Sequence, residues 1–260
     1  MSLPLRIYLG MVIFSLAGSW FCAANSFDPG QVGNIASFIT LLAGAATVLL
    51  NFQWNWKACF GAMIIGATSE IFGVYTGWPF GRYDYTENWW PTVTLPARHT
   101  YPLLLPIAWA MLVGACWGGT RAKCKAAYMI VATAIFATLA DASMEGPMTL
   151  AFKYWHWRDL SWPIDLGWKG EAPLLNWVGW FGVTVAVALV FNGLQIKIVS
   201  SWECRAVLAG HLALTLGVAA LRGYTNPTGY IEAAILILLF SAWVYIAEWH
   251  QRRTHSATDQ

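Results

Sequence analysis

Charge is the scarcest property of this sequence. Of its 260 residues, 11% are charged, and the formal net charge is +2. Soluble domains average about 25% charged residues, so this composition excludes an ordinary soluble globule. It also excludes a nucleic-acid-binding surface, because no basic cluster is interleaved with stacking aromatic residues.

Motifs for metal and cofactor chemistry are missing as well. The five cysteines form no CxxC pair, and the five histidines show no HxxH or HxxxH spacing. A zinc or di-iron site on a helix would need such spacings. There is no GxSxG elbow, P-loop or dinucleotide fingerprint. We therefore expect neither a metal nor a cofactor.

Apolar and aromatic residues dominate instead. The chain is 58% hydrophobic, with 17 tryptophans and 10 tyrosines, and its mean hydropathy is +0.51. Apolar segments recur at lengths of about 17–22 residues, enough to cross a bilayer as helices. We predict one all-α integral-membrane domain over residues 1–260, a polytopic helical bundle with about eight transmembrane helices. The expected spans are Ile7–Ala24, Gly33–Leu50, Ala58–Tyr75, Pro102–Gly118, Ala126–Met144, Leu174–Leu194, Arg205–Leu221 and Ile231–Trp249. A cleaved signal peptide with a cut site near Ala23 is the alternative for the first segment.

An even number of spans puts both termini on one side of the membrane. With the N-terminus inside, nine of the 15 Lys and Arg residues fall on the inside, among them the dense cluster Arg121, Lys123 and Lys125. Because positive charge is retained on the cytoplasmic side, this bias favours cytoplasmic N- and C-termini in a plasma (inner) membrane.

Two long loops on the outer face, Thr76–Tyr101 and Gly146–Pro173, are rich in tryptophan, tyrosine, glycine and proline. We expect them to lie on the membrane surface or to fold back over the bundle, where functional loops tend to sit. Their aromatic side chains either anchor the helices at the interface or line a slot for a long apolar ligand. The residues in question are Trp78, Phe80, Tyr83, Tyr85, Trp155 and Trp157.

Three acids lie within or at the ends of the expected spans, where a charged side chain costs about 2.5–3.5 kcal/mol and is a functional hypothesis by default. Asp141 and Glu145 are four residues apart and therefore share one helix face. Glu70 lies toward the outer end of its helix, so we expect the three carboxyl groups to converge. Neighbouring carboxyl groups in a low dielectric do not all ionise, which leaves one proton for general acid catalysis. The alternative is a structural network in which these acids pair with cations in the loops, namely Arg82, Arg98 or Lys153.

Other ionisable residues have simpler explanations. Glu232 and Glu248 lie near the ends of the last span, where the helix dipole or solvent accounts for them. His99 and His156 lie in the two long loops and are either proton-relay or surface residues. His211 lies inside the seventh span, where we expect it to be hydrogen-bonded within the bundle.

Several segments together resemble the integral-membrane carotenoid hydratases, which include γ-carotene 1′,2′-hydratase and bisanhydrobacterioruberin hydratase. The matching segments are ExxGVxTGxPFGxYxY from Glu70 to Tyr85, the D-x-x-x-[DE] pair Asp141 and Glu145, YWHW from Tyr154, and APLLNWVGWF from Ala172. The resemblance covers about half of the chain, with TGWPFGRYDY its most specific part. One departure is Gly146, which separates the second acid from Pro147.

The resemblance implies addition of water across the terminal 1,2 double bond of an acyclic carotenoid, without a cofactor. A carboxyl group protonates C2, and water captures the tertiary cation at C1. The resemblance assigns the proton donor and the water-activating base to Glu70, Asp141 and Glu145 without dividing the two roles. Tyr83, Tyr85 and Asn176 would orient groups, and Arg82 would tune the charge of an acid. The implied partners are a carotenoid, the lipid bilayer and other enzymes of the carotenoid pathway.

Two alternatives stay open. A membrane lycopene cyclase uses the same protonation but captures the cation with a second double bond, and an acidic doublet after the PFG loop would favour it. LPARHTYPL follows Thr94 instead. The second alternative is a carotenoid- or lipid-binding membrane protein without catalytic activity.

Overall fold

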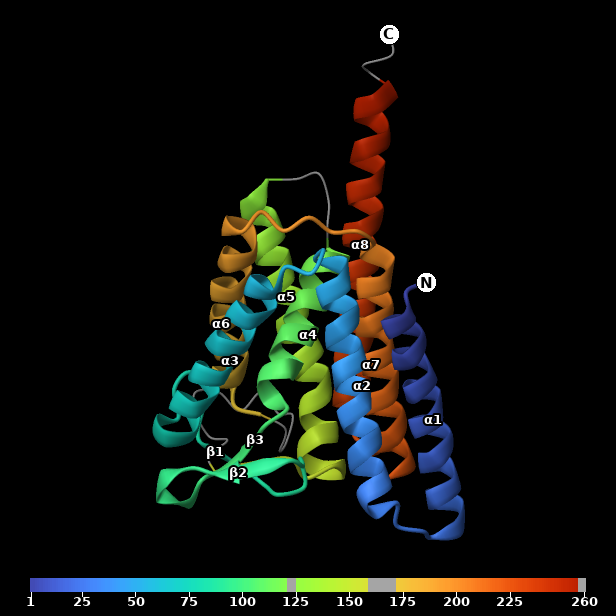
Figure 1. The fold of residues 1–260 in the computed structure, drawn as a ribbon, viewed down its shortest axis with the longest axis vertical. Helices are drawn as coiled ribbons and strands as arrows, with labels where there is room; N and C mark the ends of the chain where they lie inside the picture. Colours follow the sequence, from blue (N-terminus) through green and yellow to red (C-terminus); the bar gives the residue numbers. More distant parts are fainter. Residues whose placement is uncertain (121–124, 159–171, 257–260) are drawn as a thin grey trace.

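The computed structural model describes residues 1–120, 125–158 and 172–256, with side chains described as far as residue 247. Arg121, Lys123 and the side chain of Glu248 lie outside these residues. The eight α-helices of the described chain are α1 (Leu3–Asn25), α2 (Gly30–Asn51), α3 (Trp56–Thr76), α4 (Leu105–Gly119), α5 (Ala126–Gly146), α6 (Leu174–Gly193), α7 (Ser201–Leu221) and α8 (Thr228–Ser256). The predicted all-α bundle is confirmed (Figure 1).

Seven of these helices, all except α4, are long and apolar enough to cross a membrane. Apolar side chains cover the outer surfaces of several of them, for example Ile13 and Phe14 on α1 and Leu238 on α8. Such surfaces suit hydrocarbon, which requires no polar partner, while the helices satisfy their own backbone groups. The described chain is therefore built as an integral membrane protein.

Helix α4 differs from the sequence prediction. We expected it to span Pro102–Gly118, but it begins at Leu105 and has 15 residues, fewer than the roughly 20 that cross a bilayer. The residues before it, Thr100–Pro102, form strand β3 instead. The helix packs against α2, α3, α5 and α7, and most of its side chains are buried. A helix enclosed by others on all sides is apolar around its whole circumference, which explains why its hydropathy resembles that of a span.

Helix α5 ends later than expected. We placed its end at Met144 because Gly146 and Pro147 follow, but α5 runs through Gly146 and continues as a π-helical turn, Pro147–Ala151. Proline is tolerated in the first turn of a helical segment because its missing N–H would have no partner there. The second long loop therefore starts after Ala151, and Glu145 stays inside the helical segment.

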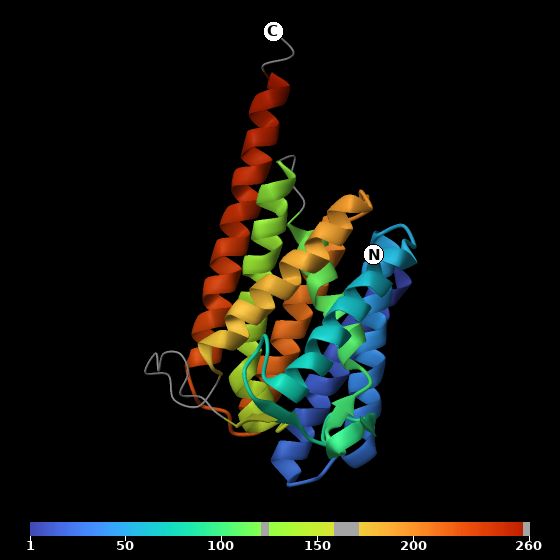
Figure 2. The same cartoon turned by 90° about the vertical axis from the view of Figure 1, so that its left-hand side faces the viewer.

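The long loops contain short strands that the sequence analysis missed. Strand β1 (Tyr83–Tyr85) pairs antiparallel with β4 (Trp155–Trp157), which joins the first long loop to the second. Strand β2 (Thr92–Thr94) pairs antiparallel with β3, and a 3-10 turn, Pro96–Arg98, lies between them. Both views place these strands at the end of the bundle opposite the two chain termini (Figures 1 and 2). The loops thus fold together over one end of the helices.

The turn from α3 into the first loop requires a glycine. Gly77 has φ +82°, a left-handed conformation, and its N–H donates to the carbonyl of Gly73 at 2.7 Å. Glycine ends helices in this way because it lacks the Cβ atom that disfavours positive φ. The chain therefore reverses here, and β1 returns alongside the last turns of α3.

Candidate active site

Glu70 is buried in α3 and both of its carboxyl oxygens accept hydrogen bonds. Its Oε2 accepts from the hydroxyl groups of Tyr83 at 2.6 Å and Tyr85 at 2.8 Å. Its Oε1 accepts from the indole N–H of Trp109 at 3.0 Å. Burial raises the pKa of both tyrosines well above the ordinary value, and the nearby Glu70 raises them further. Both hydroxyl groups therefore keep their protons and act as donors.

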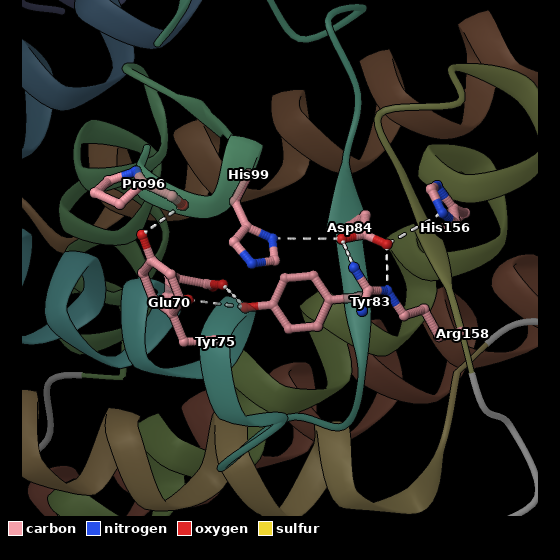
Figure 3. A network of polar contacts seen from close by, with 8 residues as sticks. All are labelled: Glu70, Tyr75, Tyr83, Asp84, Pro96, His99, His156 and Arg158. Atoms are coloured by element: carbon pink, nitrogen blue, oxygen red, sulfur yellow. Dashed lines mark hydrogen bonds and ion pairs between the residues drawn. The ribbon is translucent and has the colours of Figure 1, made fainter. Parts of the chain in front are cut away.

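Strand geometry explains why two tyrosines reach the same carboxyl oxygen. Alternate residues of a strand point to the same side, so Tyr83 and Tyr85 face Glu70 while Asp84 faces away. Asp84 contacts Arg158 and His156 from the second loop, the latter at 3.4 Å, and His99 at 3.6 Å (Figure 3). The Arg158 guanidinium lowers the pKa of the Asp84 carboxyl. These contacts hold β1 against the second loop on the side of the strand that faces away from Glu70.

Asp141 and Glu145 are bridged by one amide. The Nδ2 atom of Asn176, on α6, donates to Asp141 Oδ2 at 2.8 Å and to Glu145 Oε1 at 2.7 Å. Glu145 Oε2 also accepts from the indole N–H groups of Trp155 at 3.2 Å and Trp157 at 3.1 Å. Glu145 is thus saturated with donors on both oxygens. Asp141 Oδ1, by contrast, accepts no hydrogen bond from the described residues.

The three acids line one cavity of about 560 Å³. Of the residues that the sequence analysis assigned to an aromatic slot or to supporting roles beside the acids, six also line it, namely Phe80, Tyr83, Tyr85, Trp155, Trp157 and Asn176. Trp78 and Arg82 are not among the lining residues, and both are exposed. The structure therefore brings the three acids together and leaves these two loop residues outside.

The alternative explanation for the three acids, an ion-pair network with loop cations, is not seen in the described part of the chain. Among the described residues, no salt bridge joins Glu70, Asp141 or Glu145 to a cation, and the ion pairs that are present involve Asp84 or Glu203. The donors to the three acids are uncharged hydroxyl, indole and amide groups. Because these donors carry no positive charge, a buried carboxyl group in this cavity is neutralised by a proton rather than by a salt bridge.

Two tryptophans complete the wall, and the sequence analysis missed both. Trp109 of α4 and Trp180 of α6 stack with ring centroids 3.9 Å apart and planes 12° apart, and both line the cavity. Helix α3 makes room for them at Gly66, where a Cβ atom would collide with the Trp109 ring. Nothing in the sequence marks these two tryptophans as cavity residues, because tryptophans of membrane proteins more often lie at the interface.

Two further ionisable residues depart from their simple explanations. Glu232 of α8 is buried, with 4% of its surface exposed, and lies near enough to act electrostatically on Asp141 and Glu145. His211 of α7 lines the cavity and, contrary to expectation, makes no hydrogen bond to any described residue. His99 and His156 contact Asp84 and do not line the cavity. In the described part of the chain, no group of three or more His, Cys, Asp or Glu residues is placed to hold a metal ion.

A bundle of apolar helices around a cavity with buried acids defines an integral membrane protein with a polar site inside it. The family model described as "Carotenoid biosynthesis protein" matches residues 30–244, and the chain belongs to this family. Neither the curated proteins nor the solved structures include a match. The matched residues include all three cavity acids and both stacked tryptophans.

Proposed function

We propose that this protein is a carotenoid 1,2-hydratase, a cofactor-independent hydro-lyase that adds water to the terminal double bond of an acyclic carotenoid. The observation that carries the proposal is the convergence of Glu70, Asp141 and Glu145 on one aromatic-walled cavity. Membership of the carotenoid biosynthesis family supports the substrate class. A carotenoid is about as long as the bilayer is thick, roughly 30 Å of hydrocarbon, so its end group reaches a site near one end of the bundle.

The hydrogen bonds support a division of roles among the three acids. Both oxygens of Glu70 and both of Glu145 accept from protein donors, an arrangement that favours the carboxylate form. Asp141 has one oxygen that accepts no hydrogen bond from the described residues, and we assign the transferable proton to this oxygen. Asp141 is therefore our choice for the general acid that protonates C2 of the terminal double bond. Glu145, held beside it by Asn176, then receives the proton that the attacking water loses.

The aromatic wall suits the intermediate. Protonation at C2 leaves a tertiary cation at C1, and the faces of aromatic rings attract cations by about 0.5–2 kcal/mol each. Trp109, Trp180 and Phe80 line the cavity beside Glu70. Their faces, together with the Glu70 carboxylate, stabilise the cation until water adds.

The test is expression of the full chain in a bacterial host that accumulates lycopene, with pigments analysed by mass spectrometry. Hydration predicts new pigments heavier by the mass of one water for each end group that reacts. An isomer of unchanged mass with altered absorption identifies a cyclase instead. Unaltered lycopene in cells that contain the folded protein contradicts both activities for this substrate and leaves a binding protein. We place the protein in the plasma (inner) membrane, where other enzymes of the carotenoid pathway are candidate partners.

A further inference from the structure

The cavity also has a polar wall on helices other than α3 and α5, which carry the acids. Helices α1, α2 and α7, which pack against one another (Figure 1), contribute hydroxyl and imidazole side chains to it. These residues are Ser15 and Ser19 of α1, Ser37 and Thr40 of α2, and His211 and Thr215 of α7. A wall of hydroxyl groups within a membrane-spanning bundle offers hydrogen bonds that a polyene cannot use, but water can.

His211 is the residue of this wall that most needs a partner. It lies in the middle of α7, protein atoms surround its ring, and it is one of the residues that line the cavity. Tyr8 of α1 contacts α7 near this position, but its hydroxyl already donates to the Val207 carbonyl at 2.8 Å. An imidazole that finds no partner among the described residues at this depth is costly unless a mobile polar molecule binds it.

The wall continues to the end of the bundle where the loops lie. Asp28 of the α1–α2 connection, Lys153 of the second loop and Arg222 at the end of α7 line the same cavity. His211 is 11 residues before Arg222, which corresponds to roughly 16 Å along a helix at 1.5 Å per residue. Charged groups at the loop end and hydroxyl groups deeper in the bundle offer a path that water can follow.

We propose that His211 binds the water molecule that hydrates the substrate. This inference rests on the proposed hydratase function. A neutral imidazole has one donor and one acceptor nitrogen, so His211 can accept a hydrogen bond from water and leave an oxygen lone pair free to attack. The acid gives its proton to C2, the water oxygen forms a bond to C1, and the water proton passes to a carboxylate. Without bound water, the cation instead loses a proton from a carbon next to C1 and becomes an alkene again.

The experiment uses the full chain in lipid nanodiscs with lycopene in deuterated water. The wild-type protein is compared with His211→Phe, which keeps a ring but no hydrogen-bonding atoms, and with His211→Gln, which keeps a donor and an acceptor. We expect His211→Phe to lose hydration by about tenfold or more, while recovered lycopene still gains deuterium because protonation and its reversal continue. His211→Gln should retain most of the hydration.

Two outcomes overturn the inference: hydration by His211→Phe at the wild-type rate, or loss of both hydration and deuterium incorporation in a folded His211→Phe protein. Failure of the wild-type protein to hydrate lycopene or incorporate deuterium counts against the proposed function instead. Hydroxyl-radical footprinting of the substrate-free wild-type protein tests the water site without relying on activity or on any variant. We expect oxidation at His211, and a protected His211 contradicts the proposal.

Discussion

At the scale of single residues, the difference between Asp141 and its neighbours decides the proposed chemistry. Among the described residues, one oxygen of Asp141 has no donor, whereas both oxygens of Glu70 and both of Glu145 have donors. Asp141→Asn keeps the shape and the bridge to Asn176 but removes the transferable proton. We expect turnover in lycopene-accumulating cells to fall by at least about a hundredfold, the lower range of general acid contributions. Immunoblotting should show an unchanged protein level, and full activity in this variant would remove Asp141 from the mechanism.

The tyrosine pair allows a second test with a matched control. Tyr83→Phe and Tyr85→Phe each remove one hydrogen bond to Glu70 Oε2. A hydrogen bond to a charged group contributes about 1.5–3 kcal/mol, so each change should lower turnover by about tenfold or more. Tyr75→Phe is the control, because its hydroxyl donates to the Pro96 carbonyl at 3.0 Å at an exposed position (Figure 3). A Tyr75→Phe protein as impaired as the other two would argue against a specific role for Glu70.

At the scale of secondary-structure elements, sequence patterns predicted the helices well and the loops poorly. A run of about 20 apolar residues is a strong signal for a spanning helix, and the four-residue spacing of Asp141 and Glu145 correctly placed them on one side of α5. The strands were missed because each has only three residues, too few for alternation to be recognised. The role of Trp109 was missed because it depends on Gly66 in another helix, a contact that no local pattern records.

The close approach of α3 and α4 at that contact gives a prediction. Gly66→Ala places a Cβ atom against the Trp109 ring and should displace the indole that donates to Glu70. Overpacking of this kind costs about 1–3 kcal/mol, so the protein in detergent should melt at a lower temperature and turn over less substrate. Gly182→Ala on α6 is the control, because nothing lies within 4 Å of its added Cβ. Equal melting temperatures for the two variants would show that the contact between α3 and α4 accommodates the added methyl group without strain.

The pairing of β1 with β4 should depend on acidity. Arg158 lowers the pKa of Asp84, and His156 and His99 face the same carboxyl group. A lowered pKa in the folded state stabilises the loops above the unfolded value of about 3.9. This stabilisation is lost as the pH falls through the still lower folded value. Hydrogen exchange in Tyr83–Tyr85 should therefore accelerate below about pH 4, beyond its ordinary pH dependence, and Asp84→Asn should lack the added acceleration. Identical pH profiles for the wild-type protein and Asp84→Asn would show that the ion pairs of Asp84 do not stabilise the pairing of β1 with β4.

At the scale of the whole molecule, orientation decides on which side of the membrane the cavity opens. The long loops lie at the end of the bundle opposite the two termini (Figures 1 and 2), and their residues line the cavity together with the acids. Nine of the 15 Lys and Arg residues fall on the terminal side of the predicted topology. Positive charge is retained in the cytoplasm, so we expect cytoplasmic termini and a cavity that opens outward.

Reporter fusions test this orientation in a bacterial host. A fluorescent protein fused after Gln260 should fluoresce, and alkaline phosphatase at the same position should be inactive because it folds only outside the cytoplasm. The control joins the same reporters after Gly223, in the connection between α7 and α8, where the pattern should be reversed. Active phosphatase at Gln260 would show that the C-terminus lies outside the cytoplasm, so that the orientation in the membrane is the reverse of the predicted one. The water that the cavity receives through its loop end would then come from the cytoplasm, although the contacts among the acids would be unchanged.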